Sequence, residues 1–489
     1  MLLAVVMATV AVALFARTHW NGLYDDAFIY LRYAKNVDHG CGVRWNCAGP
    51  AVEGVTGILY LGLLAAGGLV TSELIALCQY VDATALVIAI GGAAALAVAL
   101  GRDRLPPWGV AAVALGTALV LVADDDVLLN AVNGMETALG AALVTAIAVA
   151  AAAQRPRTLA LLACAATLVR PEAALFVVAL PLLPWMRRAR VLGVCAGFLV
   201  VCAAIRYAYF GELAPNTFYA KSGGTWTHAA IGLDYIVDCV RDFPLTFAAP
   251  LALFVPGAPR RGVVYLLVVA ALWLAFFLRS GGDLFDYSRL WVPLVPALSA
   301  CALAGVAGAL QRRARFALVM PVVIALAVGG RATVEHAIPA QGTSPRVLQW
   351  AAIGTYVRAH FPRQLVATVP IGAIGYYSNN PLLDLVGLTE PAIAREGRSV
   401  PEAMLTKTWI GHERNFTEYV LAQEPAVVVT TEVRTEPWRD LAEARAGFYA
   451  DWLLLQEIKA GRAPYHVFDA ELSPGEHVLM FVRDGVTPR

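Results

Sequence analysis

Long apolar segments recur along most of the chain before Arg331, and they constrain the fold more than any other feature of the sequence. Basic clusters interrupt some of these segments, and acidic or polar stretches interrupt the others. Arginine and lysine in short loops stay on the cytoplasmic side of a membrane, so each basic cluster marks that side. The basic clusters are Arg102/Arg104, Arg155/Arg157, Arg187/Arg188/Arg190, Arg260/Arg261 and Arg312/Arg313/Arg315. This alternation predicts a polytopic α-helical membrane protein.

Eleven crossings satisfy the alternation when the N-terminus lies in the cytoplasm. The composition agrees, because 59% of the 489 residues are hydrophobic and only 15% are charged. The expected spans are residues 2–16, 75–100, 108–122, 138–153, 159–169, 173–185, 191–205, 244–255, 263–278, 290–310 and 316–330. The spans 159–169 and 173–185 are short for a hydrocarbon core of about 30 Å, so we expect their connecting turn below the outer surface.

The apolar run at residues 57–70 is not counted as a crossing. An additional crossing here would move every later basic cluster to the outer side of the membrane. We therefore expect residues 57–70 to form a helix that lies in the outer membrane interface.

The composition changes after Arg331, where the charged fraction rises and long apolar runs end. Residues 1–335 are expected to form the transmembrane domain, with a catalytic outer loop at residues 17–56, and residues 336–489 a soluble extracytoplasmic domain. Strands are expected at 365–369, 426–431 and 477–482, and helices at 346–360 and 441–457. These elements predict a small C-terminal α/β or α+β domain.

The first outer loop carries the most informative polar residues. If the stretch from Asp25 is helical, Asp25, Arg32 and Asn36 share one face, whereas Asp26 and Tyr33 lie on the next. Charged residues at the edge of a membrane are expensive and are usually functional. Asp25 and Asp26 are therefore candidate general bases, with Asp25 preferred.

Two cysteines, Cys41 and Cys47, lie in the same outer loop. An oxidising compartment would allow them to form a disulfide bond. The sequence has no metal-type CxxC pair and no histidine cluster. No cofactor is expected from these patterns, a divalent cation is left open, and no nucleic-acid partner is expected.

Several motifs resemble GT-C glycosyltransferases related to the terminal arabinofuranosyltransferases of actinobacterial cell-wall arabinan. The resemblance begins with DDAFIYLRYAKN, HGCGVRWN and VEGVTG in the first outer loop. It continues with Asn133-Gly134-Met135-Glu136-Thr137, Arg170-Pro171-Glu172, Arg206, FGELAPNTFYAK ending at Lys221, Gly281-Gly282-Asp283 with Arg289, and GAIGYYSNNPLLDLVGL. The order of these motifs along the chain carries the resemblance more than any one of them.

The resemblance implies a glycosyltransferase of a bacterial plasma membrane whose C-terminal domain lies outside. Its donor would be a polyprenyl-phosphate sugar, with arabinofuranose expected as the sugar, and its acceptor an extracytoplasmic glycan. A lipid-phosphate leaving group needs cationic stabilisation. The candidate phosphate ligands are Arg32, Arg206, Lys221 and Arg289. The candidate substrate-binding residues are Tyr33, Asn36, Glu53, Glu136, Arg170, Glu172, Asn216 and Asp283.

Each of these groups also has a structural interpretation. Asp25 with Arg32, or Arg170 with Glu172, could be ion pairs that orient the chain, and Gly281-Gly282-Asp283 could be a turn. At the level of function, a transporter or flippase of lipid-linked saccharides would also bury such charges, although no internal repeat is visible. A GT-C enzyme with a hexose donor or a protein acceptor is the other alternative.

Overall fold

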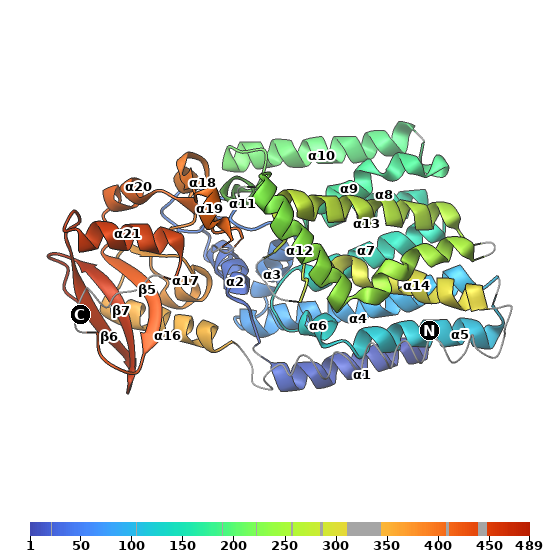
Figure 1. Ribbon diagram of the computed structural model, residues 1–489, viewed down its shortest axis with the longest axis horizontal. Coiled ribbons are helices and arrows are strands. Elements are labelled where there is room, and N and C mark those ends of the chain that lie inside the picture. The colour runs from blue at the N-terminus through green and yellow to red at the C-terminus, as the bar shows by residue number, and fades with distance from the viewer. Residues whose placement is uncertain are drawn as a thin grey trace.

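The computed structural model places a helical bundle at one end of the molecule and an α/β domain at the other (Figure 1). The structure describes residues 1–20, 22–103, 105–187, 189–221, 223–255, 258–283, 287–310, 344–406, 410–438 and 447–489. The short helices α2 (Asp25–Asp38) and α11 (Asn216–Ala220) lie between the two ends. The junction of the two domains is therefore built largely from loops of the bundle.

Most of the bundle consists of apolar helices that run along the long axis of the molecule (Figure 1). Its helices are α1 (Leu2–His19), α4 (Leu74–Gly101), α5 (Pro107–Val122), α6 (Asp125–Leu129), α7 (Thr137–Ala152), α8 (Pro156–Thr167), α9 (Ala174–Val178), α10 (Ala189–Phe210), α12 (Trp226–Asp242), α13 (Arg260–Ser280) and α14 (Val295–Leu310). The described part of the bundle also contains five 3₁₀ helices: η1 (Pro171–Ala173), η2 (Leu180–Leu182), η3 (Pro184–Met186), η4 (Pro244–Phe254) and η5 (Val292–Leu294).

Five of the described helices are long and apolar enough to cross a membrane. They are Leu2–His19, Leu74–Gly101, Ala189–Phe210, Arg260–Ser280 and Val292–Ala309. Each predicted span within the described residues contains a helix of the bundle, but the number of crossings stays a prediction. The predicted span 316–330 lies outside the described residues, as does the predicted domain boundary at residue 335.

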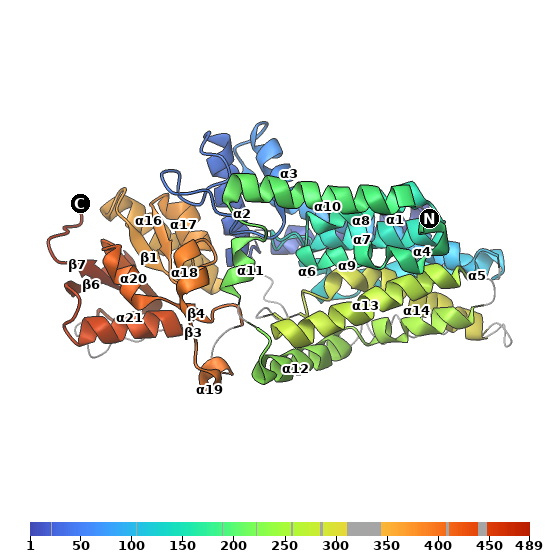
Figure 2. The same cartoon turned by 90° about the horizontal axis from the view of Figure 1, so that it is seen from above.

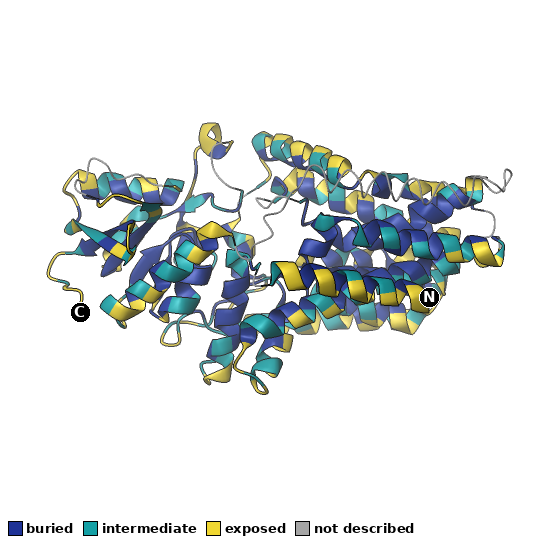
Figure 3. Cartoon of the chain, turned by 90° about the horizontal axis from the view of Figure 1, so that it is seen from below, coloured by how far each residue is buried: buried dark blue, intermediate teal, exposed yellow. Residues whose placement is uncertain are grey.

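The pattern of burial matches a bundle that is surrounded by lipid. Buried residues line the contacts between helices, whereas exposed residues lie on the outer helix faces (Figure 3). Many exposed residues are large and apolar, among them Leu14 on α1 and Val200 and Ile205 on α10. Apolar surface on this scale is rare on soluble monomers. Of the five long helices, α10 is the least buried, and it lies along one side of the bundle opposite α12 (Figure 2).

The run predicted as an interfacial helix contains α3 (Ile58–Gly68), which packs against α2 and α4. Its 11 residues reach about 16 Å along the helix axis, which is about half of the hydrocarbon thickness. The short length of α3 is compatible with the interfacial position, which stays a prediction.

The α/β domain is built on a mixed five-stranded sheet with the strand order β2-β1-β5-β7-β6. Strand β1 pairs in parallel with β2 and β5, whereas β7 pairs antiparallel with β5 and β6. The strands are β1 (Val366–Thr368), β2 (Leu382–Asp384), β5 (Val427–Arg434), β6 (Tyr465–Ser473) and β7 (Glu476–Arg483). A separate antiparallel pair consists of β3 (Arg398–Ser399) and β4 (Arg414–Asn415).

Six described helices belong to this domain, and the predicted α/β domain is confirmed. They are α16 (Pro345–His360), α17 (Gly372–Ser378), α18 (Pro391–Glu396), α19 (Glu402–Leu405), α20 (Thr417–Ala422) and α21 (Tyr449–Lys459). The three predicted strands correspond to β1, β5 and β7, and α16 matches the helix predicted at 346–360. The sequence analysis did not find β2, β6 or the β3–β4 pair. The first part of the helix predicted at 441–457 lies outside the described residues.

Candidate active site

A cavity of about 1410 Å³ lies where the bundle meets the α/β domain. Its walls come from α2, α9, α11 and α13 and from the β3–β4 region of the α/β domain. Eight of the fourteen predicted site residues line it: Asp26, Glu136, Arg170, Glu172, Arg206, Lys221, Asp283 and Arg289. The fold thus gathers charged side chains from six separate parts of the sequence around one space.

Asp26 lies in the first turn of α2 and faces the cavity. A carboxylate is favourable at this position, because the amino end of a helix carries a partial positive charge. Burial in the surrounding protein raises the pKa of Asp26, and the charges of Arg289 and Lys221 act in the opposite direction. Asp26 is therefore a carboxylate at the edge of a membrane domain, held near two cations and more basic than a free aspartate.

The neighbouring Asp25 has a different environment. Its carboxylate accepts hydrogen bonds from the backbone N–H groups of Gly372 at 3.0 Å and Ala373 at 2.7 Å, at the start of α17. Burial raises the pKa of Asp25 to about 7. Asp25 is not among the residues that line the cavity. The preference for Asp25 as the base stays a prediction that the geometry does not favour, because the contacts of Asp25 are those of an anchor between α2 and the α/β domain.

Arg32 has a similar anchoring geometry, and it does not line the cavity either. Its guanidinium donates to the backbone oxygens of Trp45, Gly375 and Asn380 and to Oδ1 of Asn46. It also lies 4.4 Å above the centre of the Trp45 ring. These contacts engage the buried side chain, so the prediction that Arg32 binds the donor phosphate lacks support from the geometry.

Four other predicted substrate-binding residues hold loops outside the cavity lining. Tyr33 donates to the backbone oxygen of Val52, and Asn36 donates to Arg44 and Trp45. Asn216 donates to the backbone oxygens of Gly387 and Leu388, and the backbone oxygen of Glu53 accepts from the Asn216 N–H. The Glu53 carboxylate pairs with Arg206. Their side-chain contacts give these four residues a positioning role.

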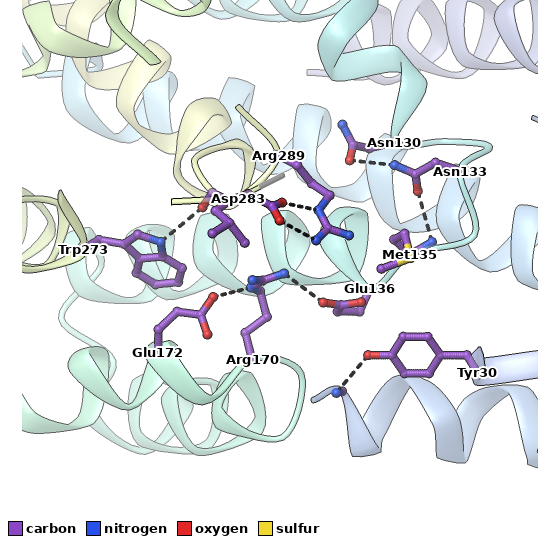
Figure 4. A network of polar contacts seen from close by, with 12 residues as sticks. Tyr30, Asn130, Asn133, Met135, Glu136, Arg170, Glu172, Trp273, Asp283 and Arg289 are labelled. Carbon is purple, nitrogen blue, oxygen red and sulfur yellow. Dashed lines mark hydrogen bonds and ion pairs between the residues drawn. The ribbon is translucent and has the colours of Figure 1, made fainter. Parts of the chain in front are cut away.

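The inner part of the cavity is lined by ion pairs (Figure 4). Arg170 lies between Glu136, at 2.8 Å, and Glu172, at 2.5 Å. Arg289 forms two hydrogen bonds with Asp283, of 2.8 and 3.3 Å. The structure thus contains the ion pair of Arg170 with Glu172, and both side chains also line the cavity. Paired charges of this kind fix the shape of a site while leaving little net charge.

Three arginines that line the cavity form ion pairs with carboxylates: Arg170, Arg206 and Arg289. Lys221 differs from them. No carboxylate of the described residues lies within 4.0 Å of its ammonium group. Asp26 and Asp283 are nevertheless near enough for their charges to interact with that of Lys221. The side chain is exposed toward the cavity at the end of α11. Among the residues that the structure describes, this cation has no carboxylate partner, so it can attract an anionic ligand.

One wall of the cavity is apolar and belongs to the bundle. Leu175 and Val178 of α9 and Leu272, Ala275 and Phe276 of α13 line it. The side chain of Val178 is mostly exposed at the surface of the bundle. This wall places an apolar surface beside the charged side chains of the cavity.

The sequence analysis missed several residues of the cavity. On the bundle side they include Tyr30, whose hydroxyl accepts from the Gly57 N–H, and Arg279 near the end of α13. On the α/β side they are Ser399, Glu402, His412, Glu413 and Arg414. Tyr30 could have been found from its helical spacing of four residues from Asp26. No quoted motif contains the residues of the α/β side.

Within the ranges that the structure describes, no group of three or more histidine, cysteine, aspartate or glutamate side chains could hold a metal ion.

The structure does contain the disulfide predicted between Cys41 and Cys47, with Cα atoms 5.2 Å apart.

Comparisons with known proteins agree on the fold. Residues 338–471 match a family described as a domain of unknown function, DUF8728. A comparison with curated proteins finds no match. ArnT from Cupriavidus metallidurans bound to undecaprenyl phosphate is 14% identical and superposes with a TM-score of 0.55, covering 98% of this chain and 97% of that one. Its apo state is 15% identical with a TM-score of 0.52, covering 97% of both chains.

The chain has the fold of ArnT. The shared fold supports the expected helical membrane protein with a C-terminal α/β domain, whereas the expected number of about eleven spans stays a prediction. At 14–15% identity, the likeness to ArnT establishes the fold alone.

Proposed function

We propose that this protein is a membrane glycosyltransferase that transfers a sugar from a polyprenyl-phosphate donor to an extracytoplasmic acceptor. The cavity carries the proposal. It combines an apolar wall in the bundle with the carboxyl group of Asp26 and the cations of Lys221 and Arg289. The apolar wall can contact a lipid tail, the two cations can bind a phosphate, and the carboxyl group can accept a proton. The fold of ArnT, which has been crystallised with undecaprenyl phosphate, adds support.

In the proposed reaction, the oxygen of an acceptor hydroxyl attacks the anomeric carbon of the donor sugar. The bond between that carbon and the phosphate oxygen breaks, and its electron pair stays on the polyprenyl phosphate. The hydroxyl proton passes to Asp26, whose raised pKa makes it a stronger base than a free aspartate. Lys221 and Arg289 stabilise the negative charge that grows on the phosphate as the bond breaks.

We further propose arabinofuranose as the donor sugar, a bacterial plasma membrane as the location and an extracytoplasmic position for the α/β domain. The donor sugar rests on the sequence motifs of the first outer loop, and the orientation rests on the basic clusters. A glycan acceptor follows from the same resemblance.

A turnover assay tests the proposal. The purified protein in nanodiscs would be incubated with decaprenyl-phosphate arabinofuranose, ribofuranose, mannose and glucose, with EDTA or Mg²⁺ in parallel. We expect the arabinofuranose donor to yield free or transferred sugar and decaprenyl phosphate, as measured by mass spectrometry. If only a hexose donor is consumed, the proposed donor sugar changes from a pentose to that hexose. If no donor is consumed, the proposal of glycosyl transfer is contradicted.

A further inference from the structure

The side of the cavity that belongs to the α/β domain differs in chemistry from the apolar wall. It is formed by the β3–β4 strands and the residues next to them, which include the apolar Val400, Leu405 and Ile410. The polar part of this region, with Gly411, is what we call the roof: Ser399, Glu402, Gly411, His412, Glu413 and Arg414. The proposed function assigns the roof no role. Its polar side chains line the same cavity as the helices α9 and α13, which would hold a lipid tail.

The roof is fixed to the bundle at two places. Oε1 of Glu413 lies 3.4 Å from Nε2 of His228, and Nδ1 of His228 lies 2.7 Å from the hydroxyl of Thr225. At the second place, the hydroxyl of Thr227 donates to Glu402 at 2.8 Å. Glu413 and His228 are almost completely buried. Contacts from two roof residues to the start of α12 set the distance between the roof and the charged centre.

The backbone of the roof also approaches Lys221 closely. Gly411 has a φ of +86°, and a β-carbon there would lie 3.3 Å from Cε of Lys221. A side chain at residue 411 would therefore be strained and would press on the lysine. This glycine allows the roof to lie directly beside the cation that we assign to the donor phosphate, so a molecule held by the roof would be next to the reacting bond.

Arg414 offers the roof a hydrogen-bond donor that the protein itself does not use. Its Nη1 donates to the backbone oxygen of Gly397 at 3.0 Å and to the hydroxyl of Ser399 at 3.2 Å, which fixes the guanidinium. Its Nε is buried and has no partner among the described residues. A buried donor without a partner is costly, and a bound ligand would remove that cost.

His412 and the two roof glutamates indicate the class of ligand. Burial lowers the pKa of His412 to about 4, and the charge of Lys221 acts in the same direction, so its ring is neutral near pH 7. A neutral imidazole can donate one hydrogen bond and accept another, as a hydroxyl group also does. Glu402 and Glu413 would repel an anionic ligand, and the polar groups of the roof would lose their hydrogen bonds to water beside a lipid chain.

We propose that the roof is the acceptor subsite and that it binds a neutral, polyhydroxylated glycan through Arg414 and His412. This inference rests on the proposed function and extends it to the acceptor. The acceptor hydroxyl would reach Asp26 from the side of the α/β domain, and the lipid donor would enter from the bundle. The two substrates would thus meet from opposite sides of the cavity.

A partition experiment tests the acceptor subsite. The full-length protein would receive the donor that it consumes, together with octyl arabinofuranoside, octyl mannoside or the anionic octyl glucuronide. The ratio of transferred sugar to hydrolysed sugar would be measured for the wild type, Arg414→Lys and His412→Gln. Arg398→Lys is the matched control, because Arg398 lies on the neighbouring strand β3 with an exposed side chain outside the cavity lining.

We expect the wild type to transfer sugar to a neutral octyl glycoside. Arg414→Lys and His412→Gln should each lower the transfer-to-hydrolysis ratio about tenfold, because each removes a hydrogen bond to the acceptor, while total donor consumption changes less than twofold. Arg398→Lys should leave the ratio unchanged. An unchanged ratio in both roof variants, preferred transfer to the glucuronide, or hydrolysis without transfer in the wild type would overturn the inference. Absence of donor consumption would instead contradict the proposed function.

Discussion

At the scale of single residues, the main result is the separation of two adjacent carboxylates. Asp25 accepts backbone hydrogen bonds from α17, whereas Asp26 faces the cavity near Lys221 and Arg289. Consecutive residues of a helix point about 100° apart, so one residue can hold the domains together while the next takes part in chemistry. The two side chains therefore provide matched variants that differ in position but not in chemistry.

Replacement of Asp26 by asparagine tests its role as the base. Asparagine keeps the size of the side chain but cannot accept the hydroxyl proton, so we expect transfer to fall about a hundredfold or more. The measurement is the initial rate of transfer with saturating donor, alongside the thermal unfolding temperature. Asp25→Asn serves as the comparison, with a smaller loss of rate and a change in thermal stability. Equal, full activity of both variants would remove Asp26 from the mechanism.

The pH dependence of stability tests the anchor at Asp25. Its pKa is raised to about 7 in the folded protein, so the folded state binds the proton more tightly than the unfolded state between about pH 4 and pH 7. The contribution of Asp25 to the free energy of unfolding should therefore be greatest at low pH and should be lost as the pH rises toward 7. We expect Asp25→Asn to show a flatter thermal unfolding profile between pH 5 and pH 8 in detergent. A variant profile parallel to that of the wild type would contradict the assigned pKa.

At the scale of elements, sequence reasoning located the helices well and the contacts between distant segments poorly. The spans predicted at 75–100 and 191–205 correspond to α4 and α10, because long apolar runs leave few alternatives to a helix. The choice between Asp25 and Asp26 depends on α17, which lies almost 350 residues later. The roof could not be predicted for the same reason, since only tertiary packing brings Arg414 to the cavity.

The disulfide between Cys41 and Cys47 belongs to the loop that follows α2. A closed loop this short contributes about 2 to 3 kcal/mol at most by chain entropy. We therefore expect Cys41→Ser with Cys47→Ser to lower the unfolding temperature modestly and leave donor hydrolysis within about twofold. Alkylation without reductant, followed by intact-mass analysis, should show no modification at these two positions. Two alkylated thiols there would contradict the bond.

The position of α3 can be tested by labelling from one side of the membrane. Leu69, directly after α3, is 81% exposed, so a cysteine there can react with an impermeant maleimide. If α3 lies in the outer interface, Leu69→Cys should react from outside only, and Asp103→Cys, in a predicted cytoplasmic loop, from inside only. Labelling of residue 69 from the cytoplasm would mean that α3 crosses the membrane, and the eleven-span prediction would then be wrong.

At the scale of the whole molecule, each side of the cavity has its own proposed role. The bundle supplies an apolar wall, α2 and α11 supply Asp26 and Lys221, and the α/β domain supplies a polar roof. The segments between the two domains hold this arrangement through Asp25, Arg32 and Asn216. Residues that the sequence marked as catalytic or phosphate-binding thus divide into those that line the cavity and those that position its walls.

The most direct test of this account is a structure of the protein with a non-hydrolysable donor, a decaprenyl-phosphonate arabinofuranose, in nanodiscs. We expect the phosphonate within hydrogen-bond distance of Lys221 and Arg289, the sugar beside Asp26 and the lipid chain along Leu175 and Phe276. A phosphonate bound elsewhere, with Lys221 and Arg289 turned away from it, would contradict the central claim.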